Sequence, residues 1–147
     1  MTDLALTHLL ILSMVVPIIG AIVISRLHKH INLRETATIV TAVILFIINV
    51  DIYLSLDLSH ATDVAASRFT FAEPIEGLSI TFSATAFGSL FALIASGLWI
   101  ATSIYAIGYM RGHGEVNQAR FYICFAVAIA AVMGLAFADN LFTLFVF

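Results

Sequence analysis

The chain has 147 residues, of which 62% are hydrophobic and 10% are charged, and its mean hydropathy is +1.10. Soluble domains carry about 25% charged residues, so a soluble core of this size could not bury so much apolar surface, and lipid is the expected solvent. The sequence has no run of lysines and arginines, which argues against a nucleic-acid-binding protein. Its single cysteine, Cys124, excludes an intrachain disulfide and a metal site built from cysteines.

Four apolar stretches are close to or above the roughly 20 residues that a helix needs to cross a bilayer. They predict transmembrane helices over Leu4–Ser25, Glu35–Leu56, Ile80–Ile107 and Phe121–Ala138. The start of the chain lacks the positive region of a secretory signal, so the first stretch is expected to remain as a span. The polar turn from Gly108 to Arg120 would join the last two helices into a membrane hairpin.

Seven further residues, Leu141–Phe147, follow the polar pair Asp139-Asn140, and all but Thr143 are apolar. As a helix they would rise only about 10 Å, which is too short to cross, so they are expected to begin a fifth span. The predicted fold class is an all-α integral membrane protein with four transmembrane helices plus the start of a fifth, an incomplete bundle. Two regions are expected: residues 1–76, with two helices and an acidic outer loop, and residues 77–147.

The first connection, Arg26–Glu35, is short and basic. It holds His28 and His30, whose spacing could suggest a metal site. Next to Lys29 on a solvated loop, these two histidines are more typical of surface residues.

The second connection, Asp57–Glu76, is the longest polar stretch and is acidic. Its middle part, Ser67–Ala72, alternates as a short strand does, so a small β-hairpin is one option there. Pro74 and Gly77 then predict a turn into the third helix.

Lysine and arginine are distributed unequally over the connections. Five of them lie in the first and third connections: Arg26, Lys29, Arg34, Arg111 and Arg120. The second connection holds only Arg68. Because basic loops remain in the cytoplasm, the first and third connections are expected to be cytoplasmic, with the N-terminus, the acidic loop and Asp139 outside. A bacterial-type inner (cell) membrane is the expected location.

Small residues recur every four positions in the third and fourth predicted helices, and this spacing places each set on one helix face. The two sets are Ala84, Gly88, Ala92, Ser96 and Ala126, Ala130, Gly134, Ala138. In lipid, helices pack by close backbone approach at small residues. We therefore predict packing seams centred on Gly88, Ala92, Ala130 and Gly134. The sequence leaves open whether these seams meet each other or other helices.

The sequence contains no motif for catalysis, cofactor binding or metal binding, so no catalytic residue, cofactor or metal ligand is expected. The acidic candidates lie at helix ends. Asp51 is expected to be either interfacial or the partner of a buried group. Asp139 would either cap the next helix, together with Asn140, or lie on a proton or cation path. Glu76 is likewise expected either to cap a helix or to lie on such a path. A proton relay needs titratable groups across the membrane, and these helices have no acid or lysine in mid-span.

Four short motifs give the second half of the chain a family resemblance. They are Ile75-Glu-Gly-Leu-Ser79, Tyr105-Ala-Ile-Gly-Tyr-Met110, Arg120-Phe-Tyr122 and Ala138-Asp-Asn-Leu141. In this order and spacing, they resemble the N-terminal part of the antiporter-like membrane subunits of Mrp-type cation/proton antiporters, the D-type above all, and of respiratory complex I (chains 4 and 5). The sequence departs from the family pattern at Glu76, Ala106 and Tyr122. The resemblance covers Ile75–Phe147, and the first two helices agree only in placement.

The resemblance implies a larger helical subunit that moves protons and, in some members, exchanges them for sodium. The family's essential glutamate on the fifth helix and lysine on the seventh have no counterpart among these residues, so no conducting residue is carried over. The expected function is therefore a mainly scaffolding part of a proton-translocating subunit, with Na⁺/H⁺ exchange as an option. Its expected partners are other membrane subunits, the bilayer, protons and Na⁺, but no nucleic acid. The parent assembly could be an NADH–quinone oxidoreductase-like enzyme. The alternative is a stand-alone structural or assembly membrane protein without transport.

Overall fold

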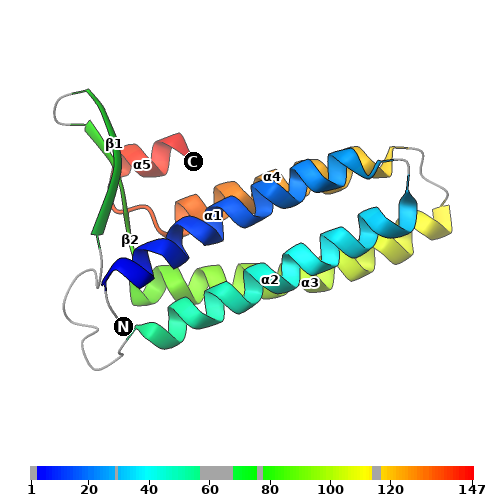
Figure 1. Cartoon of the computed structure of the whole chain (residues 1–147), viewed down its shortest axis with the longest axis horizontal. Helices are drawn as coiled ribbons and strands as arrows, with labels where there is room; N and C mark the ends of the chain where they lie inside the picture. Colours follow the sequence, from blue (N-terminus) through cyan, green and yellow to red (C-terminus); the bar gives the residue numbers. More distant parts are fainter. Residues whose placement is uncertain (1–2, 29, 57–67, 76–77, 114–116) are drawn as a thin grey trace.

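A computed structural model describes residues 3–28, 30–56, 68–75, 78–113 and 117–147. The elements are α1 (Asp3–Arg26), α2 (Ile31–Ser55), β1 (Arg68–Ile75), β2 (Leu78–Ser83), α3 (Ala86–His113), α4 (Gln118–Ala136) and α5 (Leu141–Val146). The four long helices lie side by side in an elongated bundle, and the hairpin of β1 and β2 stands across one end of it (Figure 1).

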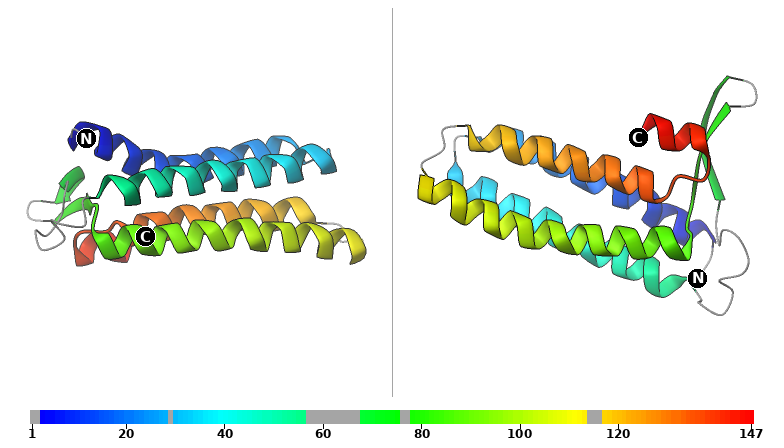
Figure 2. Two further views of the ribbon diagram at one scale, coloured as in Figure 1. Left: turned by 90° about the horizontal axis from the view of Figure 1, so that it is seen from below. Right: turned by 180° about the vertical axis from the view of Figure 1, so that it is seen from behind.

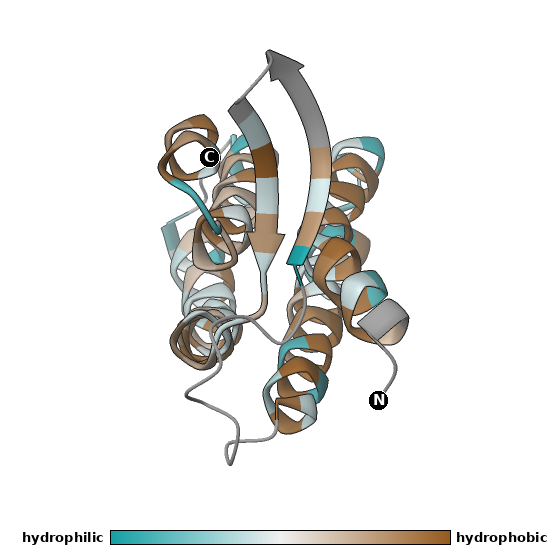
Figure 3. Cartoon of the chain, turned by 90° about the vertical axis from the view of Figure 1, so that its left-hand side faces the viewer, coloured by the Kyte–Doolittle hydropathy of each residue, from teal (hydrophilic) through white to brown (hydrophobic). Residues whose placement is uncertain are grey.

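The predicted fold class is confirmed, because four of the described helices are long and apolar enough to cross a membrane. Only about a third of each span is buried inside the bundle (28–33%). The outer faces keep large apolar side chains exposed, such as Ile22 and Leu98 at 55% and 60%. Hydrophobic residues dominate the helices in Figure 3. A surface of this kind is stable only against lipid or against other membrane helices.

The core is formed where α1 packs against α2 and α4, and where α2 packs against α3. Small residues at these contacts are fully buried, as Ala42 and Ala126 show. A Cβ atom built on Gly20 of α1 would lie 2.5 Å from a Thr41 side-chain carbon of α2. Close backbone approach of this kind provides the van der Waals contact that holds helices together in lipid.

The boundaries of the third span were predicted wrongly at both ends. Residues Ile80–Ser83 belong to β2, and α3 begins only at Ala86, because Ile80 and Phe82 alternate with polar neighbours and pair with β1. At the other end, the stretch expected to be a polar turn from Gly108 continues as helix to His113. There the His113 ring stacks on Tyr109 with centroids 4.3 Å apart.

Two other spans also differ from the prediction. The second helix begins at Ile31, not at Glu35, so the second half of the expected basic loop, Ile31–Glu35, is helical. The fourth begins at Gln118 and ends at Ala136, because the chain then pairs with β2. Ala84 and Ala138, expected at the ends of the two small-residue sets, lie outside the helices.

A β-hairpin was one option for the second connection, and β1 and β2 form it as an antiparallel pair. Pro74 lies in β1, and Gly77 is outside the described residues. Strand β2 is also tied to the chain after α4. Its Phe82 forms a bridge with Ala138, and the Ser83 amide donates to the Phe137 carbonyl at 2.9 Å. The hairpin therefore sits directly on the α4–α5 junction.

The two ends of the bundle differ in what they carry. The start of α1, the hairpin and α5 lie at one end, and the end of α1, the start of α2, the end of α3 and the start of α4 lie at the other (Figure 2). We call these the hairpin end and the loop end. Four arginines lie near the helix ends at the loop end, in α1, α2, α3 and α4 respectively: Arg26, Arg34, Arg111 and Arg120.

Candidate functional site

The charged side chains of the described spans gather at the two ends of the bundle. We define the loop-end cluster as Arg34, Glu35, Arg111, Gln118 and Tyr122, and the hairpin-end cluster as Arg68, Thr81, Asp139, Asn140 and Thr143. Among the described residues, no three His, Cys, Asp or Glu side chains come together as a metal site.

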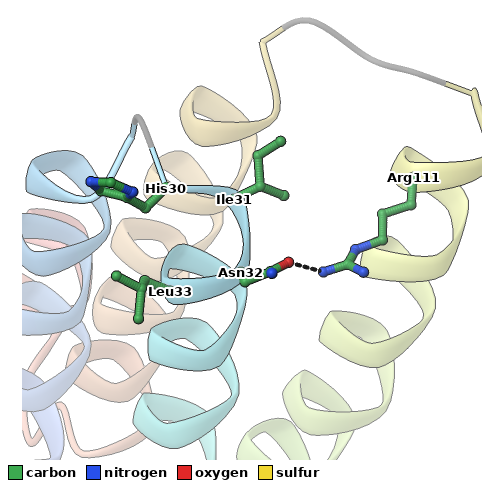
Figure 4. A pocket seen from close by; sticks show the side chains of 5 residues that line it. All are labelled: His30, Ile31, Asn32, Leu33 and Arg111. Carbon is green, nitrogen blue, oxygen red and sulfur yellow. Dashed lines mark hydrogen bonds between the residues drawn. The ribbon is translucent and has the colours of Figure 1, made fainter.

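An ion pair between a buried carboxylate and a half-exposed guanidinium joins α2 to α3 in the loop-end cluster. The Glu35 side chain is 5% exposed, and both of its oxygens accept from Arg111 Nε, at 3.2 and 3.0 Å. Arg111 Nη2 also donates to Asn32 Oδ1 at 2.7 Å (Figure 4). The Arg111 side chain remains 53% exposed toward an open hollow of about 740 Å³ at the start of α2. The carboxylate is thus buried with a partner, as a buried charge requires.

Arg34 joins α2 to α4 in the same cluster. It is 4% exposed and donates through Nη2 to Gln118 Oε1 at 2.6 Å. Its guanidinium carbon lies 5.5 Å from the centre of the Tyr122 ring, within cation–π range. Gln118 Nε2 also donates to the Met110 carbonyl of α3 at 3.3 Å. The cluster therefore ties the loop ends of α2, α3 and α4 to one another.

Polar side chains also lie deeper in the bundle. Asn49 is fully buried, and its Nδ2 donates to Met133 Sδ at 3.5 Å. Five buried polar atoms have no hydrogen-bond partner among the described residues: Arg34 Nε, Asn49 Oδ1, Trp99 Nε1, Ser103 Oγ and Tyr122 OH. None of these interior groups is an acid or a lysine. The interior is thus polar in places, but it does not form a chain of titratable groups.

The hairpin-end cluster holds Asp139 and Asn140 in different roles. The Asp139 carboxylate, 13% exposed, pairs with Arg68 Nε at 2.9 Å, and the Arg68 side chain is 61% exposed. Asn140 Oδ1 accepts from the Thr143 amide at 2.7 Å and so caps α5. Asn140 Nδ2 donates to the Ser79 carbonyl at 2.7 Å and to Thr81 Oγ1 at 2.8 Å. The carboxamide therefore fastens α5 to β2.

The other acidic candidates take no part in these clusters. Asp51 is exposed in the last turn of α2, as an interfacial residue would be. Glu76 lies outside the described residues.

The predicted packing residues lie at close contacts. A Cβ atom on Gly88 would lie 2.3 Å from the Ala136 carbonyl oxygen of α4, and one on Gly134 would lie 2.3 Å from the Phe147 ring. Ala92 is fully buried and Ala130 is 6% exposed. Gly88 of the first seam therefore approaches the backbone at the end of α4, at a residue outside the second seam, whereas Gly134 of the second seam faces the end of the chain.

Sequence reasoning missed the loop-end cluster. It placed Arg34 and Glu35 in a solvated loop and Arg111 in a polar turn, and it gave none of them a partner. The available signal was the expectation that both connections share one side of the membrane, which brings opposite charges to the same end.

In comparisons with known proteins, no protein-family model matches the chain, and no curated protein gives a significant match.

Proposed function

We propose that this chain is a scaffolding part of a proton-translocating membrane subunit of the antiporter-like type, in an Mrp-type or complex I-like assembly. One observation carries the scaffolding role. Away from the two ends of the bundle, the described spans contain no acidic side chain, lysine or arginine, since Asp51 lies within the last five residues of α2. A proton relay through the membrane needs such groups, so the conducting groups would belong to other helices of the assembly.

The positions of the family-like motifs support this proposal. Tyr105–Met110 lies near the end of α3, Arg120–Tyr122 lies near the start of α4, and Ala138–Leu141 joins α4 to α5. Residues of these motifs make the contacts that fix helix ends. Tyr122 lies against Arg34, and Asn140 caps α5 and binds β2. Fixed helix ends are what a rigid wall beside a conducting path requires.

The exposed apolar faces support a place inside a larger assembly. About two thirds of each span is not buried inside the bundle, and its exposed apolar faces are free to pack against further membrane helices. We propose the orientation that follows from the basic connections: the loop end faces the cytoplasm and the hairpin end faces outside. Clustering of Arg26, Arg34, Arg111 and Arg120 at one end supports this orientation.

The proposal is tested by proton movement in everted membrane vesicles from cells with and without the chain. A pH-sensitive dye would report the response to added Na⁺, to K⁺ and to NADH. We expect the response to one of these to be lost without the chain and restored by a plasmid copy. Unchanged responses to all three would refute a transport role and leave the stand-alone structural protein. The stimulus that fails would separate gradient-driven exchange from redox-driven pumping.

A further inference from the structure

The loop end carries an excess of positive side chains. Among the described residues of this end, one acid, Glu35, is accompanied by four arginines: Arg26, Arg34, Arg111 and Arg120. These charges leave the loop end three units positive when its histidines are neutral. Arg26 and Arg120 are exposed and form no ion pair with another described residue. A basic surface next to membrane spans attracts anionic headgroups.

One of these arginines borders the open hollow at the start of α2. Five residues line the hollow: His30, Ile31, Asn32, Leu33 and Arg111. In Figure 4 the side chains of Arg111 and Asn32 point toward each other. Arg111 uses Nε and Nη2 in its bonds to Glu35 and Asn32, and its Nη1 forms no hydrogen bond within the described part of the chain. Because the side chain is 53% exposed, Nη1 is free to donate to an anion in the hollow.

The hollow lies at the depth of the lipid headgroups. The 28 residues of α3 rise about 42 Å, whereas the hydrocarbon core of a bilayer is about 30 Å thick. A centred α3 therefore extends about 6 Å, or about four residues, beyond the core at each end. Arg111 is one of the last four residues of α3. The headgroup layer adds about 5–8 Å on each side, so the guanidinium lies within this layer.

The lining of the hollow fits a lipid better than a free anion. Ile31 and Leu33 line it and are 52% and 55% exposed. A phosphate ion would gain nothing from these two side chains, whereas the glycerol and upper acyl region of a phospholipid would cover their apolar surface. The positive charge of the loop end favours an anionic headgroup, because it repels the ammonium group of a zwitterionic one.

We propose that this hollow binds the phosphate of an anionic phospholipid through the guanidinium of Arg111. The phospholipid belongs to the leaflet on the loop-end side. The exposed Arg26 and Arg120 add to the attraction without lining the hollow. This site does not depend on the transport proposal, since it rests on the charge of the loop end, the hollow and the membrane spans.

Two substitutions with the same change of charge separate this site from general attraction to the basic surface. Asn32→Asp places a carboxylate in the hollow next to Arg111, where it competes with a phosphate. The new side chain still accepts from Arg111, and an acidic residue is favourable in the first turn of a helix, so this variant should fold. Asn117→Asp is the matched control, exposed at the N-cap of α4 and outside the hollow. Aspartate caps a helix as well as asparagine does.

Ligand titrations test the proposal. The chain, purified with its membrane partners in a neutral detergent and stripped of lipid, would be titrated with phosphatidylglycerol, phosphatidylcholine or inorganic phosphate. The rise of the Tm with ligand concentration reports binding. We expect phosphatidylglycerol to bind at least about tenfold more tightly than phosphatidylcholine, and Asn32→Asp to weaken its binding about tenfold more than Asn117→Asp does, because a hydrogen bond between charged groups is lost.

Three results of these titrations would overturn the proposal. Equal weakening by the two variants would mean general attraction to the surface and no site in the hollow. Equal affinity for phosphatidylcholine would remove the preference for an anionic headgroup. The same stabilisation by inorganic phosphate would mean that a free anion, and not a lipid, is the ligand.

A second measurement remains decisive if Asn32→Asp fails to fold. A benzophenone amino acid at Leu33, which lines the hollow, would be photoactivated in native membranes. The same amino acid at Leu98, 60% exposed in the middle part of α3, is the control. We expect the Leu33 adducts to be phospholipids enriched in anionic headgroups relative to the control. Adducts without this enrichment, or adducts to another protein, would overturn the proposal.

Discussion

The contact between α3 and α4 at Gly88 makes a sharp prediction about stability. A Cβ atom at this position would lie 2.3 Å from the Ala136 carbonyl oxygen, whereas ordinary contact begins near 3.4 Å. In Gly88→Ala, the two backbones must therefore separate by about 1.1 Å, because a carbonyl cannot rotate away as a side chain does. Overpacking of this kind costs about 1–3 kcal/mol. Gly97→Ala is the matched control on the same helix, because its Cβ would meet the Phe46 ring at 3.4 Å.

The comparison of these two variants isolates the backbone contact. Glycine to alanine gains about 1 kcal/mol of helix propensity in a helix interior, as at Gly97, and less in the first turn of α3, where Gly88 lies, so this term widens the difference that overpacking causes. Thermal unfolding in one detergent, followed by circular dichroism, should place the Tm of Gly88→Ala below that of Gly97→Ala. At about 2–4 °C per kcal/mol, the gap should be about 2–12 °C. Equal Tm values would refute the close approach of α3 and α4 at Gly88.

The two polar clusters and the basic connections give three further tests. Arg111→Leu leaves the buried Glu35 carboxylate without its charge partner and should lower the Tm, whereas Glu35→Leu/Arg111→Leu should recover most of that loss; equal losses in thermal unfolding would contradict the pairing of Glu35 with Arg111. Asn140→Ala removes the cap of α5 and its ties to β2 and should cost about 0.5–2 kcal/mol, while Asp139→Asn weakens a partly exposed ion pair and should stay within about 1 kcal/mol; the reverse order in thermal unfolding would refute these roles. With the native cysteine replaced by serine, a cysteine at Asn117 should react with an impermeant thiol reagent in everted vesicles and not in intact cells, and the opposite pattern would refute the proposed orientation.

The four spans could be predicted because membrane helices need long apolar runs, and the sequence provides four of them. The start of the third span could not be predicted in this way. A continuous apolar run fits a buried strand as well as a helix, and Ile80 and Phe82 lie in a run that leads directly into α3. The alternation with Thr81 and Ser83 was the available sign of a strand. It became decisive only when the pairing with β1 was known.

The pairing inside the loop-end cluster also lay beyond the sequence. Charge distribution alone predicts that Glu35 and Arg111 share one side of the membrane. It does not predict that these two residues, 76 positions apart, bind each other. Their pairing depends on where α2 begins and where α3 ends. Both boundaries extend past the predicted ones, since Ile31 and His113 still belong to the helices.

The contacts at the hairpin end could also be predicted only in part from the sequence. The sequence indicates Asn140 as a cap candidate, because it is the second residue of a polar pair and directly precedes an apolar stretch. Its second role, as a donor to Ser79 and Thr81, requires the hairpin to fold back over the α4–α5 junction. Asp139 was expected to be a cap or to lie on an ion path. Its carboxylate pairs with Arg68, a residue that sequence reasoning used only to count charge.

The most direct test of the scaffolding account is the composition of the particle that contains this chain in its own membrane. The chain would be purified in mild detergent and the intact particle weighed, with every component identified by sequence. The account predicts a particle much heavier than the 15.9 kDa chain. Membrane helices of the other components should carry acids and lysines in mid-span. A particle made of this chain alone, or of copies of it, would contradict the account and leave no conducting groups for it to support.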